Sequence, residues 1–264
     1  MYRLLIVTDD PVAKNMLSTM TGWEAQGFKP PRIFSTAEEA ISCMGRHSID
    51  AVAVKTSPAF DEFIAYLNEK HPYIPMFDIV STEEEQHAVI REVNRLLSRL
   101  RADDSNDLYD DALRMEEQRE RWIKKVIGGM VPTVREMTRK HRMYRCREQL
   151  NVPCVLARLE LPEDNTFLEE RWHYGSERLE TALRNFFGRE HDHMLMHVAV
   201  VSTEEVRVLC YPAVPEAGVS ENAVFTYVQE TAEQIDHYLG LNMHVLDVRR
   251  VPGLSAFAAE NDAH

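Results

Sequence analysis

The residue types best suited to metal chemistry gather in one stretch of the chain, at His191, Asp192, His193 and His197. If this stretch is a strand, side chains two positions apart share a face, so the three histidines would point the same way. Imidazoles paired in this manner can chelate zinc or nickel. Histidines at the solvent edge of a strand are far commoner than such sites, and no fourth ligand is indicated. We therefore expect no metal and no other cofactor.

The cysteines and the apolar runs indicate the compartment. Cys43, Cys146, Cys154 and Cys210 show no Cys-x-x-Cys spacing and are too few for a disulfide framework, so we expect reduced thiols in or near the cores, with no assigned function. No run of eighteen or more apolar residues occurs, and the N-terminal apolar stretch is too short for a signal peptide. We expect a cytoplasmic protein with no membrane partner.

Charge is distributed unevenly within a net charge of -13. The balances of basic against acidic residues are 11 to 18 over 1–110, 11 to 6 over 111–150 and 8 to 19 over 151–264, which indicates a basic connector between two acidic domains. The excess of acid argues against a general nucleic-acid binder. Within the connector, Arg139, Lys140 and Arg142 lie on a basic helix predicted over 133–147. This helix either contacts DNA weakly or balances the acidic domains electrostatically.

The first hundred residues alternate between short apolar runs and amphipathic segments. The pattern predicts buried strands at 3–7, 32–34, 50–54 and 75–80, and helices at 11–26, 36–44, 60–67 and 82–97. Helix starts are indicated by Asp10 before Pro11, by Ser35 or Thr36, and by Thr82 with Glu85 three residues later. Strands that alternate with helices imply an α/β domain with a parallel sheet covered on both faces.

A long helix is predicted over 105–130. Its apolar residues repeat at heptad-like spacings that would form a short coiled-coil homodimer contact. These residues are Leu108, Ala112, Met115, Trp122 and Val126. In the alternative, the same stripe packs back on a domain within a single chain. Gly128-Gly129 and Pro132 end this helix, and Thr133 caps the basic one.

The C-terminal part reads as strand, helix, strand, strand, helix, strand. The predicted strands are 154–161, 193–201, 206–211 and 242–248, and the helices are 166–187 and a second one from Ser220 or Asn222 to Tyr238. Gly240 stops the second helix. This order is that of a ferredoxin-like α+β domain, in which both helices cover one face of an antiparallel sheet.

Several segments of the N-terminal domain resemble the receiver domain of YesN-type, AraC-family response regulators. They are the opening residues through Thr8-Asp9-Asp10-Pro11, Thr21-Gly22-Trp23-Glu24 with Gly27-Phe28, and 35–40 followed by 49–52. The connector motif 119–123 with Gly128-Gly129 is similar to the same proteins. The resemblance implies a flavodoxin-like, receiver-like fold that is one strand-helix unit short.

The resemblance also implies which residues occupy the receiver's phosphorylation site. The metal-binding acidic pair falls on Thr8 and Asp9, with Asp10 beside them, and the phosphate-accepting position falls on Lys55. A lysine cannot form the acyl phosphate and would repel magnesium, and the family's conserved lysine aligns with Ile79. We therefore expect a pseudo-receiver. Lys55 either pairs with Asp9 or Asp10 or is simply solvated.

In its element order and in Tyr238-Leu239-Gly240-Leu241, the C-terminal domain is similar to the middle domain of the same regulators. That middle domain is a degenerate relative of GGDEF diguanylate cyclases. Where the cyclase has glycines and metal-binding acids, this chain has the hairpin turn Ser202, Thr203, Glu204 and Glu205. Glu160 is at most one metal-binding acid in the first strand. The resemblance therefore implies no cyclase activity.

These features together predict a pseudo-receiver (1–102), a helical connector (103–150), a degenerate GGDEF-like domain (151–250) and a tail (251–264). The expected function is non-enzymatic signalling or transcriptional regulation through protein partners or a small ligand, as a homodimer. The alternative is a DNA-binding transcription factor. The family's C-terminal helix-turn-helix motifs have no counterpart after Val248, so the chain either lacks them naturally or is a fragment.

Overall fold

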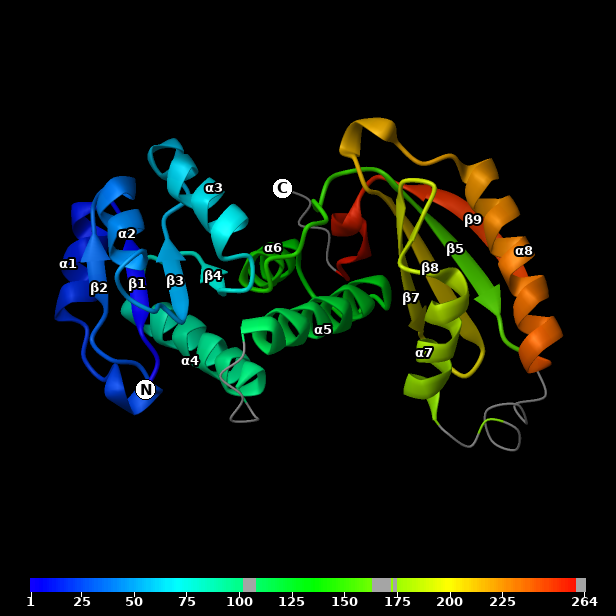
Figure 1. Ribbon diagram of the computed structural model, residues 1–264, viewed down its shortest axis with the longest axis horizontal. Helices are drawn as coiled ribbons and strands as arrows, with labels where there is room; N and C mark the ends of the chain where they lie inside the picture. Colours follow the sequence, from blue (N-terminus) through cyan, green and yellow to red (C-terminus); the bar gives the residue numbers. More distant parts are fainter. Residues whose placement is uncertain (102–107, 163–171, 173–174, 260–264) are drawn as a thin grey trace. The chain divides into compact units, whose positions relative to one another are not determined.

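A computed structural model describes residues 1–101, 108–162, 172 and 175–259. The chain folds into two compact units, which are described separately (Figure 1). The first comprises Met1–Arg119 with Arg139–Cys146, and the second comprises Glu120–Thr138 with Arg147–His264. The chain is a mixed α/β protein with a four-stranded parallel sheet in the first unit and a separate five-stranded antiparallel sheet in the second. None of the helices in the described ranges has the length and apolarity needed to cross a membrane.

The sheet of the first unit has the strand order β2-β1-β3-β4, and all its strands are parallel. The strands are β1 (Leu4–Val7), β2 (Arg32–Phe34), β3 (Ala51–Val54) and β4 (Met76–Phe77). Val7 at the end of β1 pairs with both Phe34 and Val54. The residues that follow these strands therefore meet at one edge of the sheet, which we call the carboxyl edge.

Helices cover both faces of this sheet. They are α1 (Pro11–Thr19), α2 (Ala37–Met44), α3 (Asp61–Lys70) and α4 (Glu83–Leu100). Because successive strand residues point to opposite faces, Leu4 and Ile6 pack with α1 and α4, whereas Leu5 and Val7 pack with α2 and α3. The predicted α/β domain with a covered parallel sheet is confirmed.

The predicted helix starts in the first unit are confirmed. Asp10 caps α1 by accepting hydrogen bonds from the backbone N–H of Val12 at 2.9 Å and Ala13 at 3.4 Å. Thr36, and not Ser35, caps α2, and Thr82 caps α4. Capping explains why the chain turns into a helix directly after three of its loops.

Two element lengths in this unit were predicted wrongly. The helix expected to reach Gln26 ends at Thr19, and a short 3-10 turn, Glu24–Gln26, follows. Gly22 and Gly27, with φ of 80° and 81°, leave the helical region of the backbone on either side of that turn. Strand β4 ends at Phe77 instead of residue 80, because the next residues bond to side chains: the N–H of Val80 donates to Oε1 of Gln86 at 3.0 Å.

Two helices, α5 (Leu108–Ile127) and α6 (Val134–Met143), make up most of the connector. Both helices are divided between the units. The part of α5 up to Arg119 belongs to the first unit and the part from Glu120 to the second, whereas α6 belongs to the second unit up to Thr138 and to the first from Arg139. Within the first unit, Met115 and Met143 join the apolar core that contains α1 and α4. The predicted cap is present, since Thr133 Oγ1 accepts from the N–H of Glu136 at 3.1 Å.

The apolar stripe of α5 is largely buried in a single chain. Met115 is 0%, Trp122 4% and Val126 0% exposed, whereas Ala112 is exposed. The side chain of Leu108 lies outside the described residues. The burial agrees with the alternative in which the stripe packs within one chain. The coiled-coil dimer stays a prediction.

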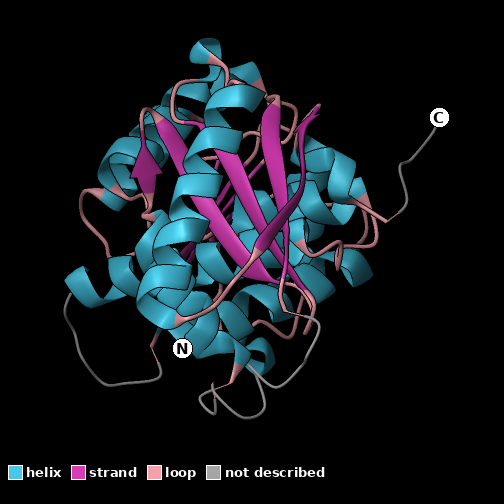
Figure 2. Cartoon of the chain, turned by 90° about the vertical axis from the view of Figure 1, so that its right-hand side faces the viewer, coloured by secondary structure: helices cyan, strands magenta, loops and turns pink. Residues whose placement is uncertain are grey.

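The sheet of the second unit has the order β6-β7-β8-β5-β9, and its paired strands are antiparallel. The strands are β5 (Cys154–Glu160), β6 (Glu190–His191), β7 (Met194–Val200), β8 (Glu205–Pro212) and β9 (His244–Val251). Helices α7 (Ser176–Phe187) and α8 (Glu221–Leu239) pack on one face of this sheet. Figure 2 shows helices in front of the strands. Leu183 and Val228 of these helices share one core with Val155 and Val208 of the sheet.

Several boundaries in this unit differ from the prediction. The strand expected from His193 begins at Met194, and β6 was not predicted. Strand β9 extends to Val251, beyond the expected end at 248, and the predicted tail contains a 3-10 turn, Leu254–Phe257, whose Leu254 is buried. The predicted start of the first helix at residue 166 lies outside the described residues.

Candidate functional site

The carboxyl edge of the parallel sheet brings together the polar residues that follow β1, β3 and β4. Thr8 directly follows β1 and is fully buried, and its Oγ1 accepts from the N–H of Asp10 at 3.2 Å. Asp9 is exposed and Asp10 is half-buried. The residues after β3 and β4 that enter this edge are Lys55, Thr56 and Asp78.

Lys55 forms an ion pair at this edge. Its Nζ lies 3.2 Å from Oδ2 of Asp10 and 4.0 Å from Oδ1 of Asp9. Because Oδ1 of Asp10 accepts from the first turn of α1, both carboxylate oxygens of Asp10 are engaged. The pKa of the Asp10 carboxyl is lowered, first by the hydrogen bond from Val12 and then by the one from Lys55.

A second cationic group reaches the same edge from α6. The guanidinium of Arg142 donates from Nη1 to Oδ1 of Asp78 and to Oγ1 of Thr56. Thr56 itself donates to Oδ1 of Asp78 at 3.0 Å. The side chain of Arg142 is 16% exposed, so this ion pair is shielded from water more than the pair of Lys55, whose side chain is 42% exposed.

Two further arginines attach the connector to the first unit. Arg119 donates to the backbone carbonyls of Pro72 and Tyr144, and Arg145 donates to Oδ1 of Asn68. Burial lowers the pKa of Arg145 to about 10, and the charges of Arg119 and Arg142 act in the same direction. The segment Arg139–Cys146 is thus held on the first unit by specific side-chain contacts.

The other basic residues considered for DNA binding are also paired. Arg139 Nη2 lies 3.1 Å and Lys140 Nζ 3.3 Å from the carboxylate of Glu92 in α4. With Arg142 bound to Asp78, all three of these cations face acidic groups of the first unit. This arrangement agrees with the electrostatic alternative for the basic helix.

The hairpin turn that the sequence analysis compared with the cyclase motif lies between β7 and β8. Ser202 Oγ accepts from the N–H of Glu204 at 3.1 Å, which closes the turn locally. Glu205 is the first residue of β8, and its carboxylate accepts from Nε of Arg158 at 2.7 Å and Nε of Arg207 at 2.9 Å. The hydrogen bond from Arg158 is the main cause that lowers the pKa of Glu205 to about 2, so this acid has one arginine partner on the adjacent strand β5 and a second, Arg207, on its own strand.

The structure does not place His191, His193 and His197 on one strand, as the sequence analysis considered. His191 ends β6 and stacks on Tyr227, with ring centroids 3.8 Å apart. Asp192 and His193 form the turn into β7 with positive φ, so His191 and His193 are not two positions apart on one strand. His197 Nε2 lies 3.0 Å from Oε1 of Glu148, at ion-pair distance but outside hydrogen-bond alignment.

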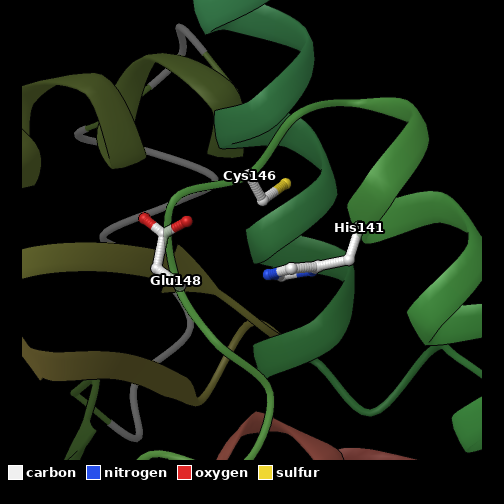
Figure 3. Close-up of side chains that lie close together, drawn as sticks. All are labelled: His141, Cys146 and Glu148. Carbon is white, nitrogen blue, oxygen red and sulfur yellow. The ribbon is translucent and has the colours of Figure 1, made fainter. Parts of the chain in front are cut away.

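Figure 3 draws His141, Cys146 and Glu148, whose side-chain types can ligate metals. His141 and Cys146 belong to the first unit, where the N–H of Cys146 donates to the carbonyl of His141 at 3.0 Å. Glu148 belongs to the second unit, where it faces His197. Each unit taken by itself brings together only two of the side chains named in this paragraph, which is too few for a structural zinc site.

The cysteines follow the sequence expectation. No disulfide joins the four, all of which lie in the described ranges; Cys43, Cys154 and Cys210 are buried and Cys146 is half-buried. Burial raises the pKa of Cys154 and of Cys210 to about 12, which keeps these thiols protonated and unreactive.

Sequence reasoning identified one half of the site at the carboxyl edge. Thr8, Asp9, Asp10 and Lys55 do come together there. Asp78 was not predicted, although a residue directly after a strand of a parallel sheet is expected at the carboxyl edge. Arg142 had no such signal, because 64 residues separate it from Asp78. The chain matches no protein-family model and no curated protein.

Proposed function

We propose that the chain is a non-enzymatic regulatory protein related to response regulators, with a receiver-like unit that takes up no phosphoryl group. It would act by binding protein partners or a small ligand. One observation carries the proposal: the Lys55 ammonium follows β3 and lies 3.2 Å from Asp10 at the carboxyl edge. A receiver needs a carboxylate at that position, because phosphate is transferred to its oxygen.

The topology of the first unit supports a receiver-like origin. The order β2-β1-β3-β4 is that of a flavodoxin-like sheet with the fifth strand absent from the described residues. Helix α4 packs on the face that α1 also covers, which is the place of the last helix in that fold. The arrangement agrees with the expectation that the chain is one strand-helix unit short.

The electrostatics of the carboxyl edge argue against magnesium binding. Magnesium is bound through one or two carboxylates at about 2 Å and keeps several water ligands, so it needs free carboxylate oxygens and room for water. Both oxygens of Asp10 are engaged, and the ammonium of Lys55 and the guanidinium of Arg142 add two positive charges beside Asp9 and Asp78. An ion pair thus takes the place that a metal and a phosphoryl group would occupy in an active receiver.

The second unit supports a binding role over catalysis. Strands β7-β8-β5-β9 with two helices on one face have the order of a ferredoxin-like domain, as nucleotide cyclases do. In the turn before β8, side chains stand where a cyclase needs glycines. The carboxylate of Glu205 is bound to Arg158 and Arg207, so it is not available to hold a metal.

Phosphotransfer to the intact chain tests the proposal directly. The chain is incubated with acetyl phosphate and magnesium, and its intact mass is measured before and after the incubation. Acid-stable and acid-labile products are then separated. We expect no phosphoryl adduct. A phosphorylatable receiver domain in the same tube serves as the positive control, and an acid-stable, base-labile phosphoryl group on Asp9, Asp10 or Asp78 would refute the proposal.

A further inference from the structure

A cavity of about 450 Å³ opens in the first unit, among the segments that lead into β3 and β4. It is thus formed at the amino ends of these strands, whereas Lys55 follows the carboxyl end of β3. Small-molecule sites have volumes of this order. The cavity is lined by the turn after α2, the turn after α3, the last turn of α4 and Asp111 of α5.

One part of the lining is apolar and well ordered by packing. Met44, Ile49, Ile74, Leu97 and Leu100 line the cavity, and each is between 3% and 7% exposed. These side chains belong to the two cores that flank the sheet. The cavity therefore offers a preformed apolar surface to the carbon skeleton of a ligand.

The other part of the lining is basic. Arg46 and His47 come from the turn after α2, His71 follows α3, and Arg101 ends α4. Asp50 and Arg101 neutralise each other as an ion pair, and Asp50 also accepts from the N–H of Arg3. Arg46 instead donates to the carbonyl and hydroxyl oxygens of Ser42, which carry no charge, so its own charge stays uncompensated by these contacts.

The pKa values of both histidines of the lining are lowered, first by burial and second by neighbouring positive charge. The pKa of His47 is lowered by burial and then by the charges of Arg32, Arg46 and Arg3. The pKa of His71 is lowered by burial and then by the charge of Arg145. The charges of Arg46, Arg32 and Arg3 thus act together at His47, and positive charge at this end of the cavity attracts anions.

We propose that this cavity binds a small organic anion, with its carboxylate or phosphate group at Arg46 and His47 and its apolar body against Ile74, Leu97 and Leu100. The anionic group is not expected near Tyr73, because Asp111 acts on that side chain. The inference names the chemical class of the small ligand in the proposed function, and in this respect it rests on the proposed function. It does not depend on Lys55, so phosphotransfer and ligand binding can fail separately.

Two-dimensional NMR of the intact chain tests the site with defined probes. Phenyl phosphate and benzoate are titrated and compared with benzylamine, which has a similar apolar ring and the opposite charge. The anions are expected to shift the backbone amides of residues 44–50 and of His71, Tyr73 and Ile74 saturably, whereas benzylamine leaves them unchanged. Equal shifts from benzylamine, or no saturable shift at these amides, would overturn the proposal.

Matched variants separate the site from general charge effects. Arg46→Gln is expected to weaken phenyl phosphate binding roughly tenfold, through the loss of one charge-assisted contact. Arg46→Lys should restore most of the affinity, and Arg91→Gln, the same charge change at an exposed position of α4, should leave it unaltered. An unchanged affinity in Arg46→Gln, or an equal loss in Arg91→Gln, would contradict the assignment.

Discussion

In the proposed function, Lys55 determines what the carboxyl edge of the first unit can bind. Its ammonium occupies the position after β3 and holds Asp10 by an ion pair of 3.2 Å. A single carboxylate there would change the chemistry, because phosphoryl transfer and magnesium binding both need oxygen ligands. The functional proposal therefore depends on the charge of one side chain.

Removal of that charge should be visible in the titration of Asp10. In Lys55→Met the pKa of Asp10 is expected to rise, because the Lys55 contribution is lost. It should stay below the ordinary value, since the stronger hydrogen bond from Val12 persists. Carboxyl carbon NMR shifts measured against pH give the pKa. Lys29→Met, which changes an exposed lysine that is not a partner of Asp10, is the control; equal pKa values in Lys55→Met and the wild type would contradict the ion pair.

Glu205 links stability to acid pH. Its pKa is lowered to about 2 in the folded state, so its contribution is present above the ordinary carboxyl pKa and is lost as pH falls through the folded value. Glu205→Gln should therefore cost about 1 kcal/mol at neutral pH, and the difference from the wild type should vanish between about pH 4.5 and 2. Urea unfolding at several pH values measures it. A pH-independent difference would mean that the pair with Arg158 contributes nothing.

At the scale of elements, the sequence predicted the helix caps and the alternation of strands with helices in the first unit. Asp10 and Thr82 begin α1 and α4 where predicted, because a side-chain acceptor followed by a helical pattern is a local signal. The end of β4 was not readable. It is set by Asp78 and Val80, which bond to Arg142 and Gln86 instead of continuing the strand.

The docking of α6 on the first unit should depend on Arg142. Arg142→Ala removes the contacts to Asp78 and Thr56 and is expected to cost about 2 kcal/mol of local stability. Hydrogen exchange of the amides of 139–146 reads out this loss directly. Arg139→Ala should have a much smaller effect, because Lys140 still pairs with Glu92. Similar exchange in both variants would show that Arg142 does not hold the segment.

At the scale of the whole molecule, the two-part organisation followed from charge and pattern, but the division of the connector did not. The basic middle of the sequence predicted a separate element, whereas α5 and α6 each contribute residues to both compact units. That division depends on contacts between residues far apart in sequence, such as Arg119 with Pro72 and Arg142 with Asp78. Such pairings leave no periodic signal in one sequence.

The same pairings bear on nucleic acid. Because Arg139, Lys140 and Arg142 face Glu92 and Asp78 and the net charge is -13, we expect no mobility shift of duplex DNA even at low salt. A basic DNA-binding domain of known affinity serves as the positive control. A shift that disappears when the three residues are changed to Glu would establish the DNA-binding alternative.

The most direct measurement of the central claim is an NMR titration of the intact chain with magnesium and beryllofluoride, a mimic of the phosphoryl group on aspartate. The amides of Asp9, Asp10, Lys55, Thr56 and Asp78 report on the carboxyl edge. We predict no saturable shift of these amides when both components are present. A saturable shift that requires magnesium and beryllofluoride together would contradict an edge closed by the Lys55–Asp10 ion pair.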